Sequence, residues 1–260
     1  MIACNKIQVD YGRNFELKSL CFSIKKGQMV SLVGPNGSGK TTVLKAMSRL
    51  LPLKSGYVYL DGMDINKQCT RKIAKKMAVL SQHNVIPPDF TVEELVSYGR
   101  VPHRGLLEWS GAKDKKIVEW AMCQTGIESF SARKVNTLSG GERQKVWIAM
   151  ALAQEPDILL LDEPTTFLDI CHQLEVMELV RKLNLEYKIT VLMVLHDLNQ
   201  AAKYSQRMIA LKNGRIVADG SPDQVLTENF LEEVYCIHSE VRLDMNTGKP
   251  FFNPVGLLKK

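Results

Sequence analysis

Three short stretches of the sequence hold residues whose types and spacing could bind phosphate and activate water. Residues 34–41 read G-P-N-G-S-G-K-T, which fits the pattern G-x-x-x-x-G-K-(S/T) at every fixed position. The apolar run Met29–Val33 precedes this stretch, and helical periodicity follows it over Thr42–Leu50. The glycines let successive backbone N–H groups face one point, at which the following helix also aims its positive end. The pattern predicts a phosphate-binding loop, in which Lys40 reaches the outer phosphates and Thr41 offers a hydroxyl to Mg²⁺.

A pair of acids follows a second apolar run. The run is Ile158–Leu161, and Asp162 and Glu163 come directly after it. Ligands of open α/β sheets bind at the carboxyl ends of the strands, which is where these acids are expected. Asp162 is predicted to orient Mg²⁺ and its water, and Glu163, pointing elsewhere, to polarise the attacking water. The alternative is a strand that simply ends in solvated acids.

The third stretch is L-S-G-G-E, from Leu138 to Glu142. The spacing of Ser139 and Glu142 is that of a capping box, so it predicts the start of a helix. Ser139, Gly140 and Gly141 would also present a hydroxyl and N–H groups at that helix N-terminus, which makes a second anion site. One terminal phosphate does not need two complete cradles from one chain. We therefore expect this stretch to complete the nucleotide pocket of another copy.

These stretches need a sheet with helices to position them. Strand candidates at Ile158–Leu161 and Thr190–Leu195 are followed by helical segments at Leu174–Leu183 and Leu198–Tyr204. Such alternation predicts an α/β fold with a mainly parallel sheet covered by helices on both faces.

Three other regions depart from this alternation. Tighter alternation and turn residues predict an antiparallel β element over Ile2–Asp61. Residues 89–136 show helical patterns with no strand, which predicts a helical insertion. The turn signal N-T-G-K-P predicts a small hairpin in Val241–Pro254.

Composition limits the class of protein. With 260 residues, 45% hydrophobic and 24% charged, the chain is of ordinary globular type, which excludes disordered, collagen-like and coiled-coil chains. The net charge of +6 is compatible with a solvated surface, phosphate ligands, an anionic membrane face or nucleic acid. The six scattered cysteines predict reduced thiols without a disulfide framework or zinc site. Neither a signal peptide nor a membrane span is predicted, since the longest apolar runs fall far short of ~20 residues.

L-S-G-G-E, the phosphate loop and L-L-L-D-E-P together resemble the nucleotide-binding domain of ABC transporters, over about residues 2–240. The resemblance implies a P-loop NTPase (RecA-like) core with an N-terminal antiparallel β element and an inserted α-helical subdomain. The implied domain is 1–240, with its core at about 1–88 and 144–240, its helical subdomain at about 89–143, and a short extension at 241–260.

The resemblance also assigns roles to residues that have no meaning alone. Tyr11 matches the aromatic residue that stacks on adenine, and Gln82 the glutamine that touches Mg²⁺ and the attacking water. Asp169 matches the loop that crosses the dimer interface, although T-T-F-L-D replaces the commoner S-A-L-D. His196, in V-L-H-D, matches the histidine that contacts the γ-phosphate.

The cofactors implied are ATP and Mg²⁺. The implied catalytic residues are Lys40, Gln82, Glu163 and His196, and the Mg²⁺ ligands are Thr41, Gln82 and Asp162. The implied ATP-binding residues are Tyr11, Gly34, Pro35, Asn36, Gly37, Ser38, Gly39, Lys40, Thr41 and Thr42. The partner-site signature is Ser139, Gly140, Gly141 and Glu142.

Residues 91–107, 152–179 and 194–205 resemble importers for iron–siderophore, haem and cobalamin, with iron–siderophore the first expectation. This implies an ATPase at the cytoplasmic face of the cell membrane that docks under a permease through residues near Val85–Arg100. Arg100 and His103 could instead be ordinary exposed polar residues.

The resemblance further implies a head-to-tail ATP sandwich with a second copy, and indirect coupling to an extracytoplasmic substrate-binding protein. No nucleic acid is expected as a partner. The alternative is a soluble ABC-type ATPase that acts on nucleic acid or ribosomes. Such relatives usually carry two such domains or long inserted coiled coils, whereas this sequence has one domain and no heptad run.

Overall fold

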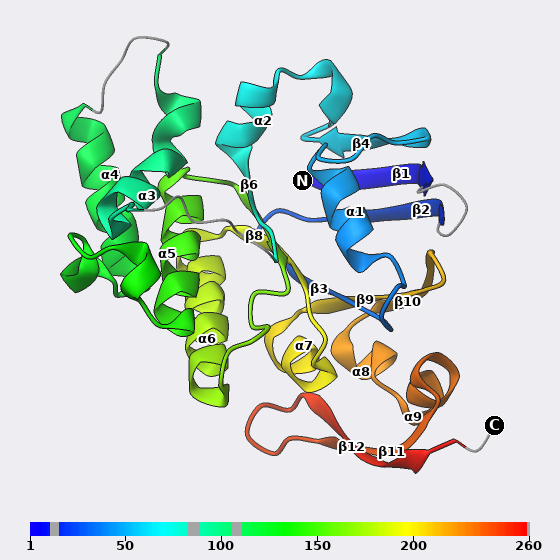
Figure 1. The fold of residues 1–260 in the computed structure, drawn as a ribbon. Helices are drawn as coiled ribbons and strands as arrows, with labels where there is room; N and C mark the ends of the chain where they lie inside the picture. Colours follow the sequence, from blue (N-terminus) through cyan, green and yellow to red (C-terminus); the bar gives the residue numbers. More distant parts are fainter. Residues whose placement is uncertain (11–15, 83–88, 106–110, 259–260) are drawn as a thin grey trace. The chain divides into compact units, whose positions relative to one another are not determined.

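The computed structural model describes residues 1–10, 16–82, 89–105 and 111–258 (Figure 1). The chain forms two compact units, one of residues 1–67 with 190–260 and one of residues 68–189. Tyr11 and the first residues of the expected docking segment, 85–88, lie outside the described residues. Among the residues described, no helix combines the length and apolar character that a membrane crossing requires.

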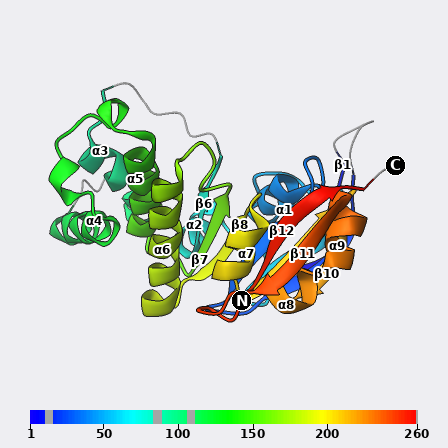
Figure 2. The same cartoon turned by 90° about the horizontal axis from the view of Figure 1, so that it is seen from below.

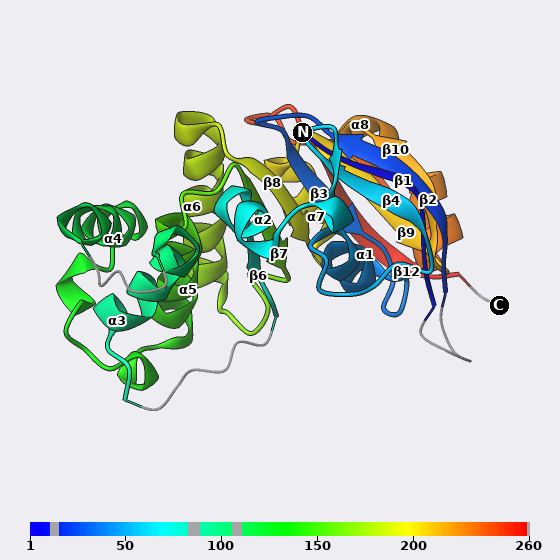
Figure 3. The same cartoon turned by 90° about the horizontal axis from the view of Figure 1, so that it is seen from above.

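The first unit begins with an antiparallel sheet of order β2-β1-β4-β5, which confirms the expected N-terminal β element (Figure 3). On β1, Ile2, Cys4, Ile7 and Val9 are buried between more exposed neighbours, because alternate side chains of a strand face opposite sides. The strands and the helical turn of this part are β1 (Ile2–Asp10), β2 (Glu16–Ile24), β4 (Ser55–Leu60), β5 (Met63–Asp64) and η2 (Ile65–Lys67).

A second set of strands in the same unit carries the phosphate loop. The strands β3 and β8 are parallel, β9 is parallel to β3, and β10 pairs antiparallel with β9. All residues of β3 and β8 are buried, as their continuous apolar sequences predict for central parallel strands. The elements are β3 (Met29–Val33), α1 (Lys40–Met47), β8 (Thr190–Val194), α7 (Leu198–Tyr204), β9 (Arg207–Lys212) and β10 (Arg215–Gly220).

The C-terminal part of this unit ends in the expected hairpin, which runs beside α7 in Figure 2. Asn199 of α7 holds the hairpin, because its side chain exchanges hydrogen bonds of 2.8 and 3.1 Å with the backbone of Phe252. The hairpin strands extend beyond the expected residues 241–254, since pairing continues from Leu243↔Pro250 to Ile237↔Leu257. The elements are α8 (Pro222–Val225), α9 (Glu228–Phe230), η6 (Leu231–Tyr235), β11 (Ile237–Leu243) and β12 (Pro250–Leu257).

The second unit combines one parallel strand pair with most of the helices. The strands β6 and β7 pair in register from Met77↔Ile158 to Leu80↔Leu161. Helix α5 packs against α3 and α4, and its buried apolar residues form the centre of this unit. The elements are α2 (Thr70–Lys76), β6 (Met77–Leu80), α3 (Val92–Ser97), η3 (Tyr98–His103), α4 (Ala112–Thr125), η4 (Glu128–Phe130), η5 (Val135–Thr137), α5 (Gly140–Ala153), β7 (Ile158–Asp162) and α6 (Ile170–Tyr187).

Candidate nucleotide site

The phosphate loop connects β3 to α1, and its backbone has a shape that only glycine adopts easily. Gly37 has a φ of +76° and Gly39 a φ of +105°. Gly39 is also the N-cap of α1, and no side chain caps this helix end. Lys40 turns its ammonium back over the loop, with Nζ at 2.8 Å from the carbonyl oxygen of Gly34 and 3.1 Å from that of Pro35. The loop therefore places a cation beside the uncapped N–H donors of a helix start, which suits a polyphosphate.

Residues from the C-terminal part of the chain also contact the phosphate loop. A Cβ atom at Gly34, whose φ is +143°, would lie 2.1 Å from the carbonyl oxygen of Leu211. The N–H group of Gly214 donates a 3.1 Å hydrogen bond to the carbonyl of Ser38. Tyr235 also reaches the loop: burial raises the pKa of its phenol, and a hydrogen bond with the Gly34 backbone opposes that rise. Sequence reasoning missed these contacts, because only the Asn-Gly turn at 213–214 left a local signal.

The loop contains one polar atom that lacks a protein partner. Within the part of the chain that the structure describes, the buried hydroxyl oxygen of Ser38 makes no hydrogen bond. A buried polar group without a partner destabilises a protein by about 1–3 kcal/mol, and a phosphate oxygen would remove that penalty. The loop thus fits a phosphate ligand by an observation independent of its sequence motif.

His196 leaves the sheet at the same edge as the phosphate loop. Leu32 of β3 lies opposite Val194 of β8, so Gly34 and His196 each follow two residues after a registered pair. His196 is exposed. Asp197 fixes the turn that follows, because its carboxylate accepts hydrogen bonds of 2.8 and 3.0 Å from the N–H groups at the start of α7.

The same logic brings Gln82 and Glu163 together in the second unit. Leu80 lies opposite Leu161, and the two polar residues each come two positions later. Gln82 Nε2 donates a 2.6 Å hydrogen bond to Glu163 Oε2. Thr166, which sequence reasoning did not single out, donates a 3.0 Å hydrogen bond to the same oxygen.

The two acids have different surroundings. Asp162 is 3% exposed, whereas Glu163 is partly exposed. The left-handed backbone of Glu163, with a φ of +53°, ends the strand and turns the chain between them. The buried carboxylate can place negative charge near a cation, and the more accessible one can contact water.

The L-S-G-G-E stretch forms the capping box that its spacing predicts. Ser139 Oγ accepts a 3.3 Å hydrogen bond from the N–H of Glu142, and Glu142 Oε2 accepts a 2.7 Å one from the N–H of Ser139. The Ser139 side chain also bonds the Glu142 carboxylate, and the backbone N–H together with this side chain holds the pKa of Glu142 below its usual range. Helix α5 therefore starts on its own interactions.

His172, a residue missed in the sequence, connects this helix start to Asp169. A Cβ atom at Gly141 would lie 2.1 Å from the ring of His172, so the ring rests directly on the glycine backbone. Asp169 caps α6 and accepts 2.9 Å hydrogen bonds from both the N–H and the Nδ1–H of His172. These hydrogen bonds, that of the backbone N–H first, hold the pKa of Asp169 below its usual range. Asp169 remains exposed.

The types of donor suit Mg²⁺. Thr41 offers a hydroxyl, Gln82 an amide oxygen and Asp162 a carboxylate, and hard oxygen ligands are what Mg²⁺ takes. Mg²⁺ is commonly held by one or two carboxylates together with substrate phosphates, and Asp162 is a buried carboxylate.

One sequence expectation is wrong. The alternative that Arg100 is an ordinary exposed polar residue is contradicted, because Arg100 is 2% exposed. Its guanidinium forms ion pairs with Asp114 and Glu155 and also donates to the carbonyl of Ala153. The physical reason is that a planar guanidinium with three acceptors can be buried at modest penalty. His103 is half-buried and hydrogen-bonded to the carbonyl of Gln154.

Comparison with known proteins agrees with this geometry. The family described as "ABC transporter" matches residues 17–166. Petrobactin import ATP-binding protein FpuC of Bacillus anthracis is 46% identical over 260 residues, which cover 100% of this chain and 95% of that protein. Iron(3+)-hydroxamate import ATP-binding protein FhuC of Bacillus subtilis (strain 168) is 45% identical over 258 residues, 99% of this chain and 96% of that protein.

The fold has solved counterparts as well. The dimeric structure of MJ0796, a bacterial ABC transporter cassette, superposes with a TM-score of 0.75 at 33% identity, over 85% of this chain and 98% of that one. The expected α/β P-loop NTPase fold is thereby confirmed. The phosphate loop, the acid pair and the capped glycine stretch occur together in a chain with full-length ATP-binding relatives, so this chain belongs to the ABC transporter family as an ATP-binding, ATP-hydrolysing member.

Proposed function

We propose that this chain is the ATPase subunit of an importer that takes up an iron–siderophore complex through a membrane permease. The support is the full-length similarity to two import proteins, one for petrobactin and one for iron(3+)-hydroxamate. The proposed place of the chain is the cytoplasmic face of the membrane, where it docks on the permease. An extracytoplasmic binding protein delivers the ligand, so the ligand itself never needs to touch this chain.

The chain's own residues divide the work of hydrolysis. Lys40 and the N–H groups of the loop from Gly34 to Thr42 hold the phosphates, and Tyr11 stacks on adenine. Thr41, Gln82 and Asp162 hold Mg²⁺, which when bound neutralises charge on the phosphates. Glu163 orients the attacking water, and His196 contacts the γ-phosphate. Phosphoryl transfer needs positioning and charge stabilisation above all, which these groups supply.

A second copy completes the reaction in this proposal. Ser139, with Gly140 and Gly141, donates to the γ-phosphate of the partner copy, and Asp169 lies in the loop that crosses the interface. Two exposed apolar residues flank Asp169: Phe167 is 87% and Ile170 76% exposed, which a second copy would cover. The dimeric state of MJ0796 supports the same arrangement.

The domain limits belong to the same proposal. The nucleotide-binding domain is residues 1–240, with a core at about 1–88 and 144–240 and a helical subdomain at about 89–143. Residues 241–260 form an extension to which we assign no chemistry.

The hydrogen bond of 2.6 Å between Gln82 and Glu163 carries the catalytic part of the proposal, because it joins the metal-contacting amide to the water-orienting acid. The variant Glu163→Gln is expected to bind ATP normally, to lose at least about 100-fold in hydrolysis rate, and to accumulate as an ATP-bound dimer. The matched control is Glu186→Gln, an exposed acid of α6, which should keep the wild-type rate. A Glu163→Gln variant that stays monomeric on gel filtration with ATP would contradict the sandwich mechanism.

The transport part needs its own experiment. In a strain deleted for this chain, uptake of a labelled ferric siderophore should be lost and restored by the wild-type chain but not by Glu163→Gln. Labelled haem and cobalamin, tested in the same strain, check the ligand class. Co-purification decides against the alternative function: a multi-span permease supports import, whereas ribosomes or DNA would support a soluble ATPase.

A further inference from the structure

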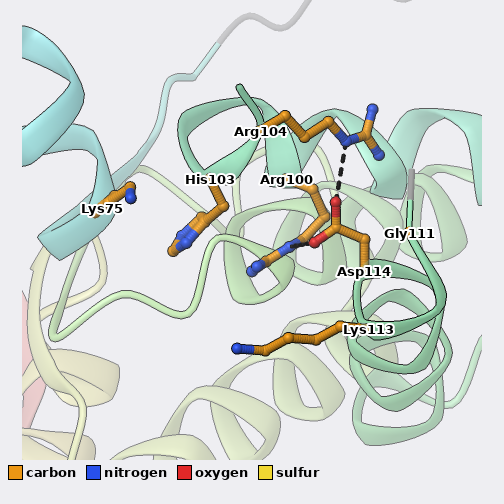
Figure 4. A pocket seen from close by; sticks show the side chains of 7 residues that line it. All are labelled: Lys75, Arg100, His103, Arg104, Gly111, Lys113 and Asp114. Carbon is orange, nitrogen blue, oxygen red and sulfur yellow. Dashed lines mark hydrogen bonds and ion pairs between the residues drawn. The ribbon is translucent and has the colours of Figure 1, made fainter. Parts of the chain in front are cut away.

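A basic pocket lies in the second unit and uses none of the residues assigned to the nucleotide. Its cavity volume is about 530 Å³. The side chains come from α2, from η3 with the residue after it, and from the start of α4 (Figure 4). The residues that line it are Lys75, Arg100, His103, Arg104, Gly111, Lys113 and Asp114.

Part of the positive charge is compensated inside the wall. Asp114 accepts a 2.9 Å hydrogen bond from Arg100 and a 3.2 Å one from Arg104. Burial by itself raises the pKa of Asp114, but the hydrogen bonds from the two arginines outweigh it and hold that pKa below its ordinary value. Arg100 is paired a second time, with Glu155 at 2.8 Å. The arginines therefore serve mainly to build the wall.

The two lysines are left with their charge facing the cavity. Among the residues that the structure describes, neither Lys75 nor Lys113 takes part in an ion pair, and in Figure 4 they enter the pocket from opposite sides. The two lysines together with Arg100 and Arg104 carry four positive charges. Asp114 and Glu155 carry two negative charges, which leaves two positive charges in excess. The Nε2–H of His103 already donates a 2.9 Å hydrogen bond to the carbonyl of Gln154, so it needs no further acceptor in the pocket.

The wall is held in place before any ligand arrives. Arg71 of α2 donates to the carbonyls of Pro102, at 2.7 Å, and Arg104, and so fixes α2 to the end of η3. Asp114 fixes α4 to η3 through the two arginines. Preorganised donors bind an anion without a penalty for ordering the site.

The start of α4 adds a further attraction for an anion. Its N-cap is Gly111, which lines the pocket and provides no side-chain cap. The first N–H groups of a helix of 14 residues carry partial positive charge, which favours a negative ligand near them.

We propose that this pocket binds a phosphate group of a second ligand, independently of the ATP site. Two excess positive charges match a phosphate monoester of about −2, and lysine is a common point-charge partner of phosphate. A cavity of about 530 Å³ has room for the rest of a small phosphorylated molecule or for a lipid headgroup. Both sources share the phosphate chemistry that the pocket recognises.

The test compares two double variants with the same change in net charge. Lys75→Gln with Lys113→Gln removes the two pocket lysines. Lys72→Gln with Lys115→Gln removes two exposed lysines of the same helices that do not line the pocket. All chains also carry Lys40→Ala, so that the phosphate loop contributes little. Binding is measured by calorimetry with pyrophosphate, and by flotation with vesicles of phosphatidylglycerol or of phosphatidylcholine.

The pocket variant is expected to weaken pyrophosphate binding at least about tenfold and the control variant less than about twofold. If the pocket variant loses binding only to phosphatidylglycerol vesicles, the phosphate belongs to a lipid headgroup. If it loses binding to pyrophosphate, the phosphate belongs to a soluble ligand. Equal weakening by both variants, or no binding of either probe to the unsubstituted pocket, overturns the proposal. Thermal unfolding of both variants near the reference midpoint confirms that each chain is folded.

Discussion

Helices α1 and α5 both begin in a glycine-rich stretch, yet their N-termini are built in opposite ways. Helix α1 has the left-handed Gly39 as N-cap and no side-chain acceptor for its first N–H groups. Helix α5 has Ser139 as N-cap. In the Ser139–Glu142 capping box, the backbone N–H of each residue donates to the side chain of the other. Both ends are expected to meet phosphate, but only the first leaves its donors open.

The difference indicates two ways to make an anion site. The α1 end is incomplete without a ligand, and the buried, unpartnered Ser38 hydroxyl beside it, in the described part of the loop, makes the same point. The α5 end is complete by itself, because the Ser139–Glu142 capping box supplies its acceptors. In the proposed mechanism, the first kind of site binds ATP within one copy, and the second kind meets the nucleotide that the other copy holds. Substitutions that act on one end only can test this contrast.

The largest effect is expected from Gly34→Ala. The new Cβ would lie 2.1 Å from the carbonyl oxygen of Leu211, at a φ of +143° that alanine rarely adopts. We expect about 2–4 kcal/mol of destabilisation and a loss of ATP hydrolysis of at least about 100-fold, since the loop must shift. Urea unfolding and ATPase assays measure the two effects.

The control for this substitution is Gly62→Ala, in the turn between β4 and β5. Its φ of +80° is equally left-handed, but nothing lies within 4 Å of the added Cβ. It should lose about 1 kcal/mol and keep full activity. Equal ATPase losses in both variants would show that the loss does not depend on the contact between Gly34 and Leu211.

At the α5 end, Gly141→Ala and Gly140→Ala form the next pair. A Cβ at Gly141 would lie 2.1 Å from the His172 ring, whereas one at Gly140 meets Leu168 at an ordinary 3.6 Å. Gly141→Ala is therefore expected to lose about 1–3 kcal/mol and to displace His172 from Asp169. Gly140→Ala should be neutral or slightly stabilising, because alanine favours helix. Urea unfolding together with gel filtration in ATP separates them, and a tolerated Gly141→Ala would refute the packing of His172 on the glycine.

The Ser139→Ala variant sharpens the contrast between capping and ligand contact. Loss of the cap is expected to destabilise the protein by about 1 kcal/mol. The Thr91–Glu94 capping box of α3 is built in the same way, so Thr91→Ala should lose a similar amount. Only Ser139→Ala should also slow ATP hydrolysis, because only that hydroxyl is proposed to meet the partner's phosphate. Equal ATPase rates in the two variants would mean that Ser139 acts as a cap and nothing more.

The contrast also shows which features the sequence could predict. The phosphate loop, the capping box and the acid pair at the end of β7 depend on local spacing, so they were accessible, whereas Gln82 after β6 acquired a role only through the family resemblance. Tyr235 and Leu211 contact Gly34 across about the whole chain, and no local pattern encodes such a contact.

The burial of Arg100 could not be predicted for the same reason. Its partners Asp114 and Glu155 follow 14 and 55 residues later and are brought to it only by the packing of η3, α4 and α5. Charge on an isolated side chain predicts exposure, and only tertiary structure shows that the charge is paired. Thr166 and His172 were given no role from the sequence, because their contacts are with Glu163 and Gly141, whose positions the fold has to set first.

The smallest effect is expected from Glu142→Gln, and it concerns pH. Hydrogen bonds from Ser139, that of the backbone N–H first, hold the pKa of Glu142 below its usual range. A lowered pKa in the folded state contributes stability that is present above the unfolded pKa of about 4.3 and is lost as pH falls through the folded value. Glutamine can keep the capping box but does not titrate. The free energy of unfolding of the wild-type chain should therefore exceed that of the variant by a few tenths of a kcal/mol at pH 7, and this difference should vanish below about pH 4.

Glu94→Gln is the parallel substitution in α3, since the pKa of Glu94 is lowered in the same way by Thr91. Urea midpoints of both variants and the wild-type chain, taken from pH 7 to about pH 3, should converge on one value toward acid. Other carboxylates titrate equally in all three chains and cancel in the comparison. A difference that stays constant with pH would mean that the carboxylate charge at the α5 start contributes nothing. Helix α1 has no acid in its first turn, so its start makes no such pH-dependent contribution to stability. The pH dependence therefore distinguishes the capped start of α5 from the uncapped start of α1.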